Sequence, residues 1–337
     1  MQILNEDRHL VRLNTASKSA ANVSPSPPSV KPRRQRRRQA RKQPLVGEID
    51  DNKGYRVIKT VGISSPGEMG HAVAKVLIDR GMPVIACLAG RGERSRQRAD
   101  LAGIEAVPTL AEVAQRADLF LSILPPEHAS AMARQIAATG ESLTYVDCNA
   151  ISPNTAISIG DLAAAAGLTF VDAGIIGPPP LRAGITRFYA SGEQADEFAA
   201  LSQYGLDIRV VGSEIGQASG FKMCYASQTK GRYAIFIESL VAAQRLGFYD
   251  LLVAELQSSQ ATTYADIEKM VPGIPLKAGR WIAEMEEIAV TFGEVGMTQR
   301  IFRGVADLYR AVDGADPETL DGAALEQLIA RLASKMK

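Results

Sequence analysis

The sequence has 337 residues, of which 46% are hydrophobic and 6% aromatic, and its formal net charge is +1. This length is comfortable for two domains, and the aliphatic, alanine-rich composition suits helices that pack closely on a sheet. No apolar run approaches the roughly 20 residues of a membrane span, the N-terminus lacks the apolar core of a secretory signal, and the three cysteines form no C-x-x-C pair, so we expect a cytoplasmic protein with no membrane segment and no metal site.

The first 54 residues differ in composition from the rest of the chain. Lys31–Lys42 reads KPRRQRRRQARK, with eight basic residues and no acid, and SPSPPS precedes it. Such a segment cannot bury enough apolar surface to fold, so we predict a disordered basic leader over residues 1–54. The run has no interleaved aromatic residues, and we do not expect nucleic-acid contact by residues 31–42. A non-enzymatic protein that senses nucleotides or binds nucleic acid through this leader is kept as an alternative, and it requires the leader for function.

Strands and helices alternate in the next part of the chain, residues 55–215. Buried strands are predicted at RVIKTVGI, PVIACLA, DLFLSIL, SLTYVDCNA and LTFVDAGIIG, and helices at EMGHAVAKVLIDRG and RSRQRADLAG. This alternation predicts an α/β fold with a Rossmann-type, doubly wound parallel sheet, in which ligands bind at the carboxyl ends of the strands.

The turn between the first strand and its helix, VGISSPGEMG, is similar to the Gly-x-Gly-x-x-Gly turn of dinucleotide sites. Gly67 falls where the backbone must approach the pyrophosphate, and Gly70 falls where the helix must pack against the strand. Ser65 replaces the glycine of the tight turn. We therefore predict a cofactor site formed here by Gly62, Ser64, Ser65, Pro66, Gly67, Glu68, Met69 and Gly70.

The turn after the second strand, CLAGRGERSR, indicates which nicotinamide cofactor binds. An NAD site usually places an acidic residue there for the ribose 2′-hydroxyl, whereas the first carboxylate in this turn is Glu93. Arg91, Arg94 and Ser95 supply instead the cationic and hydroxyl donors that suit a 2′-phosphate. We predict NADP, with NAD as the alternative cofactor. In the alternative without a binding role, these arginines only form a solvated face at the start of a helix.

Two further strands end in residues that are placed to meet the same cofactor. Leu124 and Pro125 end the strand DLFLSIL, and Asn149 follows the strand SLTYVDC. The side chain of Asn149 is predicted to bond the nicotinamide carboxamide or the substrate, because ligands of such sheets lie at these strand ends.

The chain after residue 216 is predicted to be an all-α C-terminal domain, residues 216–337. Helices are expected at about 216–246, 249–258, 262–271, 276–295, 299–312 and 322–336. The helix that carries Trp281 has two possible interpretations. It forms a wall of the substrate pocket, where Arg280 or Lys277 meets an anionic substrate, or it is an amphipathic helix that only packs against its neighbours.

One lysine in the first of these helices is a candidate acid–base group. Reduction of a carbonyl needs a hydride on carbon and a proton on oxygen, and therefore a positioned general acid. Lys222 lies in the apolar stretch ASGFKMCYASQ, where partial burial lowers the pKa of a lysine. We predict Lys222 as the catalytic residue, with Tyr225 at i+3 as the competing donor. The structural alternative is a lysine that extends from a core helix to solvent.

The chain resembles the β-hydroxyacid dehydrogenase family, which includes 3-hydroxyisobutyrate and 6-phosphogluconate dehydrogenases. Five segments carry the resemblance: VGISSPGEMGHAVAKVL, LSILPPEHA, VDCNAISPNTA, FVDAGIIGPPPLRAGITRFYASG and GQASGFKMCYASQTKG. It implies hydride transfer between NAD(P) and a small hydroxy acid or a related alcohol or carbonyl substrate, with the family's catalytic lysine at Lys222. It also implies a homodimer formed through the helical domain.

The chain departs from the family pattern near the expected substrate site. Many relatives have Ser-Gly-Gly where this chain has Ile176-Gly177-Pro178, and many have Asn where Tyr225 and Ala226 stand. These departures indicate a divergent branch with a reshaped pocket. Imine reductases resemble the same architecture, so imine reduction is the alternative from another reaction class.

Overall fold

The computed structural model describes residues 57–313 and 324–335. The whole predicted leader, residues 1–54, lies outside the described residues, and so does its basic run at residues 31–42. Within the described part, no helix combines the length and the apolar character needed to cross a membrane.

An eight-stranded sheet forms the first part of the structure, in the order β3-β2-β1-β4-β5-β6-β7-β8. All neighbouring strands are parallel except β6 and β7, which are antiparallel. The strands are β1 (Val61–Ile63), β2 (Val84–Cys87), β3 (Glu105–Val107), β4 (Leu119–Ser122), β5 (Thr144–Asp147), β6 (Thr169–Ile176), β7 (Arg187–Ser191) and β8 (Asp207–Gly212). The strand order reverses between β1 and β4, which is where a doubly wound sheet binds its ligand.

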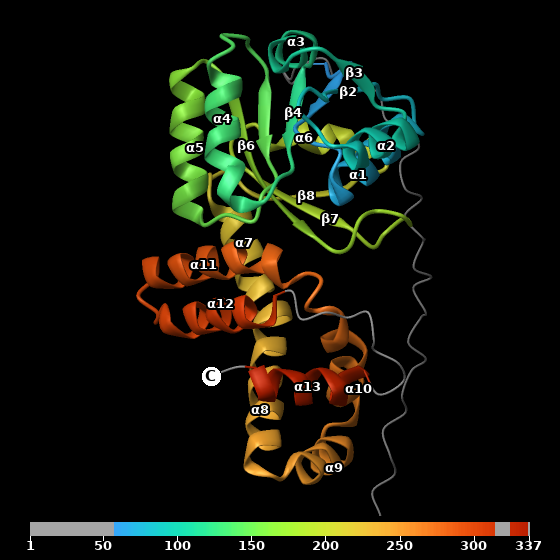
Figure 1. Cartoon of the computed structure of the whole chain (residues 1–337). Helices are drawn as coiled ribbons and strands as arrows, with labels where there is room; N and C mark the ends of the chain where they lie inside the picture. Colours follow the sequence, from blue (N-terminus) through green and yellow to red (C-terminus); the bar gives the residue numbers. More distant parts are fainter. Residues whose placement is uncertain (1–56, 314–323, 336–337) are drawn as a thin grey trace, which may run out of the picture. The chain divides into compact units, whose positions relative to one another are not determined.

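Helices cover both faces of the sheet (Figure 1), as its buried, apolar strands require. One core cluster joins the strands to α1 (Glu68–Ile78), α2 (Glu93–Ala102) and α6 (Ala195–Ala199). The other joins them to α3 (Leu110–Arg116), α4 (Ala129–Ala137) and α5 (Pro153–Ala165). The predicted Rossmann-type α/β sheet is therefore confirmed.

The remainder of the described chain is helical, as predicted, and has its own core cluster. Its helices are α7 (Gln217–Ala226), α8 (Arg232–Leu246), α9 (Tyr249–Ser259), α10 (Ala261–Met270), α11 (Ala278–Glu294), α12 (Arg300–Val312) and α13 (Ala324–Lys335). A π-helical turn, η4 (Ser227–Gly231), joins α7 to α8, and short 3₁₀ turns lie at Pro126–His128, Ala200–Tyr204 and Val271–Gly273. The exact division at residue 215 stays a prediction.

Helix α11 connects this helical part to the sheet. Arg280, Glu284 and Glu287 are spaced i, i+4 and i+7, so they lie on one face of α11. Glu287 Oε2 accepts a hydrogen bond from the backbone N–H of Ser152, at 2.6 Å. Ser152 is the N-cap of α5, so a carboxylate of α11 lies at the positive end of a helix that covers the sheet.

Candidate functional site

Three glycines shape the turn between β1 and α1. A side chain built on Gly67 meets nothing within 4 Å, which leaves open space beside the N-terminus of α1. A Cβ on Gly70 would lie 2.2 Å from the carbonyl oxygen of Ser65, so the helix touches the turn there. Gly62 has a different position: its Cβ would lie 2.7 Å from Val113 Cγ1, so it allows α3 to pack closely.

Ser64 holds this turn against the end of β4, the neighbouring strand in the sheet. Ser64 is buried, and its hydroxyl oxygen accepts a hydrogen bond from the backbone N–H of Ile123 at 2.9 Å. Pro66 is buried, and Met69 packs against the core of the sheet. Ser65, in the position of the tight-turn glycine, is half-buried.

The turn after β2 faces a cavity of about 330 Å³ that also reaches the first turn. Arg91 lines this cavity, and its Nη2 donates to the carbonyl oxygen of Ser64 at 3.0 Å. Arg94 is exposed and Ser95 half-buried at the start of α2. Glu93 is exposed and accepts a hydrogen bond from Gln97 of the same helix. Among the described residues, a guanidinium and no carboxylate therefore lines this cavity.

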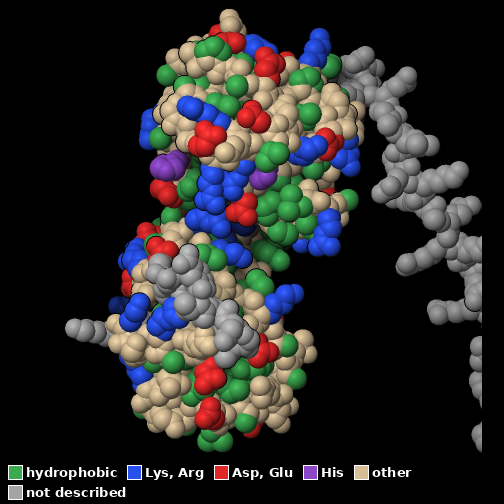
Figure 2. All heavy atoms as spheres, turned by 45° about the vertical axis from the view of Figure 1, so that its right-hand side comes forward, with side chains coloured by type: hydrophobic (Ala, Val, Ile, Leu, Met, Phe, Trp, Pro, Cys, Tyr) green, Lys and Arg blue, Asp and Glu red, His purple; other side chains and the backbone are tan. Residues whose placement is uncertain are grey.

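Cations surround the first residue of α1. Arg280 of α11 donates to Glu68 Oε2 at 2.9 Å, and this hydrogen bond, with the charges of Arg280, Arg98 and Lys277, lowers the pKa of Glu68 against the effect of partial burial. On the face drawn in Figure 2, Lys and Arg side chains gather at about mid-height of the view. The helical part thus brings positive charge to the N-terminus of α1, where a phosphate group also binds favourably.

Asn149 joins the ends of β4 and β5. Its Nδ2 donates to Ser122 Oγ at 2.9 Å and to Asp147 Oδ2 at 3.0 Å, and its Oδ1 accepts from the backbone N–H of Leu124 at 2.6 Å. Both amide hydrogens are therefore engaged, and the side chain is buried. In this structure Asn149 fixes the loop that carries Leu124 and Pro125; its contact with a cofactor stays a prediction.

Asp147 is fully buried beneath this loop. Burial raises its pKa to about 7, with the nearby Asp172 acting in the same direction and hydrogen bonds from Asn149 opposing. In the unfolded chain the carboxyl has its ordinary pKa of 3.8. Between these values the folded protein holds a proton that the unfolded chain has lost, so stability falls as the pH rises through this window.

We expect Asp147→Asn to remove that part of the pH dependence, because a neutral amide resembles the protonated acid. From pH 4.5 to pH 7.5 the unfolding free energy of the wild type should fall by on the order of 3 kcal/mol relative to the variant. Urea unfolding at the two pH values measures this. Asp161→Asn, at an exposed position of α5, is the control and should keep the wild-type slope. Equal slopes in all three proteins would contradict the assignment.

Lys222 is held by contacts between α7 and β6. Asp172 of β6 accepts hydrogen bonds from the backbone N–H groups of Gly216 and Ser219 and from the Ser219 hydroxyl, which anchors the start of α7. A Cβ on Gly174 would lie 2.7 Å from Lys222 Cβ, so the helix and strand are in close contact. Lys222 Nζ donates to the carbonyl oxygen of Ile175 at 2.8 Å. The ammonium is thereby fixed near the carboxyl end of β6.

A second lysine and a buried glutamate accompany Lys222. Lys222 Nζ lies 3.6 Å from Glu284 Oε1, and Lys230 forms an ion pair with Glu284 Oε2. Only 14% of the Lys222 side chain and 6% of the Glu284 side chain are exposed, whereas Tyr225 is 42% exposed. The structure brings Lys222 together with Glu284 and Lys230, which we did not predict as site residues. One signal for Lys230 is present in the sequence: it is a second lysine in the same apolar segment, eight residues after Lys222.

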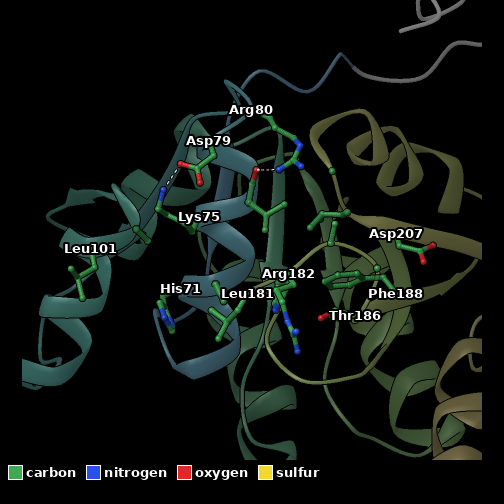
Figure 3. Close-up of a pocket in the computed structure, with 18 residues that line it drawn as sticks. His71, Lys75, Asp79, Arg80, Leu101, Leu181, Arg182, Thr186, Phe188 and Asp207 are labelled. Carbon is green, nitrogen blue, oxygen red and sulfur yellow. Dashed lines mark hydrogen bonds and ion pairs between the residues drawn. The ribbon is translucent and has the colours of Figure 1, made fainter. Parts of the chain in front are cut away.

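A larger cavity, of about 430 Å³, lies outside this region (Figure 3). It runs along α1 and the turn after it, from His71 to Arg80, and Leu181 and Arg182 of the β6–β7 loop lie across from that helix. None of the predicted cofactor or catalytic residues lines it. The proline-rich segment that departs from the family pattern contributes to it through Pro180.

Comparisons with known families match two parts of the chain. Residues 60–204 match the family described as the NAD binding domain of 6-phosphogluconate dehydrogenase. Residues 243–312 match a domain of unknown function (DUF1932).

Two similar proteins each match more than half of the chain. A solved conserved protein of unknown function, described as structurally similar to 3-hydroxyacid dehydrogenases, is 30% identical and has a TM-score of 0.58, over 75% of this chain and 97% of that one. An uncharacterized 28.5 kDa protein of Methanothermus fervidus is 28% identical over 209 residues, 62% of this chain and 80% of that protein.

Two enzymes share the fold at lower identity. The 3-hydroxyisobutyrate dehydrogenase of Mycobacterium tuberculosis is 17% identical with a TM-score of 0.60, over 81% of this chain and 99% of that one. An imine reductase of Myxococcus stipitatus, solved with NADP+, is 17% identical with a TM-score of 0.51, over 83% of this chain and all of that one.

Proposed function

Because this chain belongs to a divergent branch of the β-hydroxyacid dehydrogenase-like family, we propose that it is an NADP-dependent oxidoreductase. Its proposed substrate is a small hydroxy acid or a related alcohol or carbonyl compound. The observation that carries the proposal is the part-buried ammonium of Lys222, fixed near the carboxyl end of β6. The dinucleotide turn after β1 belongs to the same sheet, and parallel strands of a sheet end at one edge.

In the proposed reaction, some residues bind the cofactor and others transfer the proton. A bound nicotinamide would supply or accept the hydride. The N-terminus of α1 and the open space at Gly67 would hold the pyrophosphate, and Arg91 would hold the 2′-phosphate. Lys222 Nζ gives a proton to the carbonyl oxygen in reduction, and its neutral form accepts the hydroxyl proton in oxidation. Tyr225 is the competing donor.

A panel assay tests this function. Hydroxy acids, their oxo counterparts and cyclic imines are offered with NADPH or NADP+, and the absorbance of NADPH is followed. We expect turnover with members of the hydroxy-acid or oxo-acid set. Turnover confined to imines would favour the imine reductase alternative, and NADPH binding without turnover of any class would favour a nucleotide-sensing protein.

Arg91 is expected to set the cofactor preference. Arg91→Asp replaces a phosphate partner with a repelling charge, so NADP affinity should fall by about 10- to 100-fold, the effect of one charge-assisted contact. NAD affinity should change little. Titration of both cofactors by fluorescence measures the ratio, with Arg96→Asp, at an exposed position of the following helix α2, as the control. Equal losses for the two cofactors would contradict the NADP assignment.

We also propose that the protein is a homodimer formed through its helical part. Ile235 of α8 and Ile301 of α12 are 59% and 56% exposed, and both line an apolar groove between these helices. Exposed apolar patches of this kind are typical of protein interfaces. Sedimentation equilibrium measures the mass, and the mass of a single 36.1 kDa chain would contradict the dimer.

A further inference from the structure

Two lysines of one long helical segment share a single carboxylate. Lys222 belongs to α7 and Lys230 to the π turn η4, and both ammonium groups lie beside Glu284 of α11. In an uninterrupted α-helix, positions eight apart differ by about 80° around the axis. The wider π turn reduces this angle, so it brings Lys230 towards the face that carries Lys222.

The charges of this cluster do not cancel. Burial acts to raise the pKa of Glu284, but the ammonium groups of Lys230 and Lys222 outweigh it and bring the pKa below its ordinary value. Burial lowers the pKa of Lys230, and the charge of Glu284 opposes that effect. While both lysines are protonated, the cluster holds two positive charges and one negative charge. Glu284 Oε1 is buried and accepts no hydrogen bond from the described residues. A surplus charge in a partly buried place is unfavourable until a counter-ion reaches it.

Lys230 has capacity to bind that counter-ion. An ammonium has three donor hydrogens. Among the described residues, the contacts of Lys230 Nζ are the ion pair with Glu284 and the ring of Trp281, whose centroid is 5.4 Å away. Its side chain is 20% exposed, more than that of Lys222. The carbonyl oxygen of Lys230 accepts a hydrogen bond from the Tyr309 hydroxyl at 2.6 Å, which fixes the backbone of the π turn.

We infer that Lys230 binds the carboxylate of the substrate, and that Glu284 positions both lysines, Lys230 for binding and Lys222 for proton transfer. This inference rests on the proposed oxidoreductase function and specifies its substrate as a compound with one carboxylate. One such group neutralises the surplus charge of the cluster. A cationic iminium increases that surplus, so the cluster disfavours the substrate class of an imine reductase.

The single tryptophan of the chain provides a direct measurement, because Trp281 lies against Lys230. The full chain is saturated with NADP+ and titrated with 3-hydroxypropanoate or with its neutral counterpart, 3-hydroxypropanamide, while tryptophan fluorescence is followed. The carboxylate should give a saturable change, and the amide should bind at least about tenfold more weakly. Equal binding of the two compounds, or no response to the carboxylate, would overturn the inference without requiring any variant.

Variants then assign the effect to Lys230. Lys230→Gln should weaken 3-hydroxypropanoate binding by about 10- to 100-fold, and Lys230→Arg, which keeps the charge, should recover part of the loss. Lys269→Gln is the matched control, at an exposed position of α10, and should bind as the wild type does. Unchanged binding by Lys230→Gln, with an unchanged melting temperature, would overturn the inference.

Kinetics separate this inference from the proposed function. With an active substrate, Lys230→Gln should raise KM and largely keep kcat, because the carboxylate contact is made before and during the reaction. Glu284→Gln should lower kcat as well, since it releases both lysines. Turnover with a KM that Lys230→Gln does not change would overturn only the inference. Absence of turnover would contradict the proposed function, whereas the fluorescence titration would still decide whether Lys230 binds a carboxylate.

Discussion

Replacing Lys222 with Ala is expected to lower kcat by about 10²–10⁴-fold, the usual contribution of a positioned general acid–base. NADP affinity should stay nearly unchanged, because the dinucleotide turn and the cavity at Arg91 belong to the sheet and its helices. The fold should survive, since Glu284 keeps Lys230 as its ion-pair partner. Steady-state kinetics, with cofactor titration and thermal unfolding of the same variant, measure all three.

Two further variants test the chemical role. Lys222→Arg should restore little activity, because a guanidinium stays protonated and cannot exchange its proton in each cycle. Tyr225→Phe should keep most of kcat, since Tyr225 is 42% exposed and Lys222 is held against β6. High activity in Lys222→Ala together with loss in Tyr225→Phe would move the acid–base role to the tyrosine.

Gly67→Val is expected to weaken NADP binding by about 100-fold or more, because the side chain fills the space that the pyrophosphate requires. The fold should tolerate the change. Gly67 has φ −66° and ψ −173°, an extended conformation that any residue adopts, and its Cβ would meet nothing within 4 Å. The melting temperature should therefore stay within about 2 °C of the wild type.

Gly70→Val is the matched comparison, three residues along the same helix. Its Cβ would lie 2.2 Å from a backbone oxygen of the turn, so this variant should lose stability by about 3 kcal/mol as well as cofactor affinity. Calorimetry and cofactor titration distinguish the two variants. A Gly67→Val protein that binds NADP normally would show that the turn is an ordinary strand–turn–helix connection.

Periodicity predicted the regular helices closely. The helix expected at 276–295 is observed as Ala278–Glu294, and that at 299–312 as Arg300–Val312, because their apolar residues recur at helical spacing. Strands β3, β7 and β8 were not predicted; β3 has only three residues, of which two are exposed. The residues of β8 are mostly exposed or half-buried, and β7 depends on antiparallel pairing with β6, so neither strand has a strong local pattern.

The site could be predicted where a local motif defines it and not where distant residues meet. The glycine turn and Lys222 were predicted as site residues from short segments, and their roles stay predictions. Glu284 was not, because a glutamate in an amphipathic helix usually faces solvent, and its partners lie 54 and 62 residues away in the chain. The π turn that places Lys230 adds one residue to a helical turn, and a periodic pattern does not show where such an addition falls.

The three acidic and basic contacts on one face of α11 have a thermodynamic consequence. Arg280 touches the first residue of α1, Glu284 the two lysines, and Glu287 the start of α5. A ligand that displaces α11 at one of these contacts also changes the interaction free energies of the other two contacts. Linkage is reciprocal. If the dinucleotide alters the affinity for the carboxylate substrate through α11, the substrate must alter the affinity for the dinucleotide by the same factor.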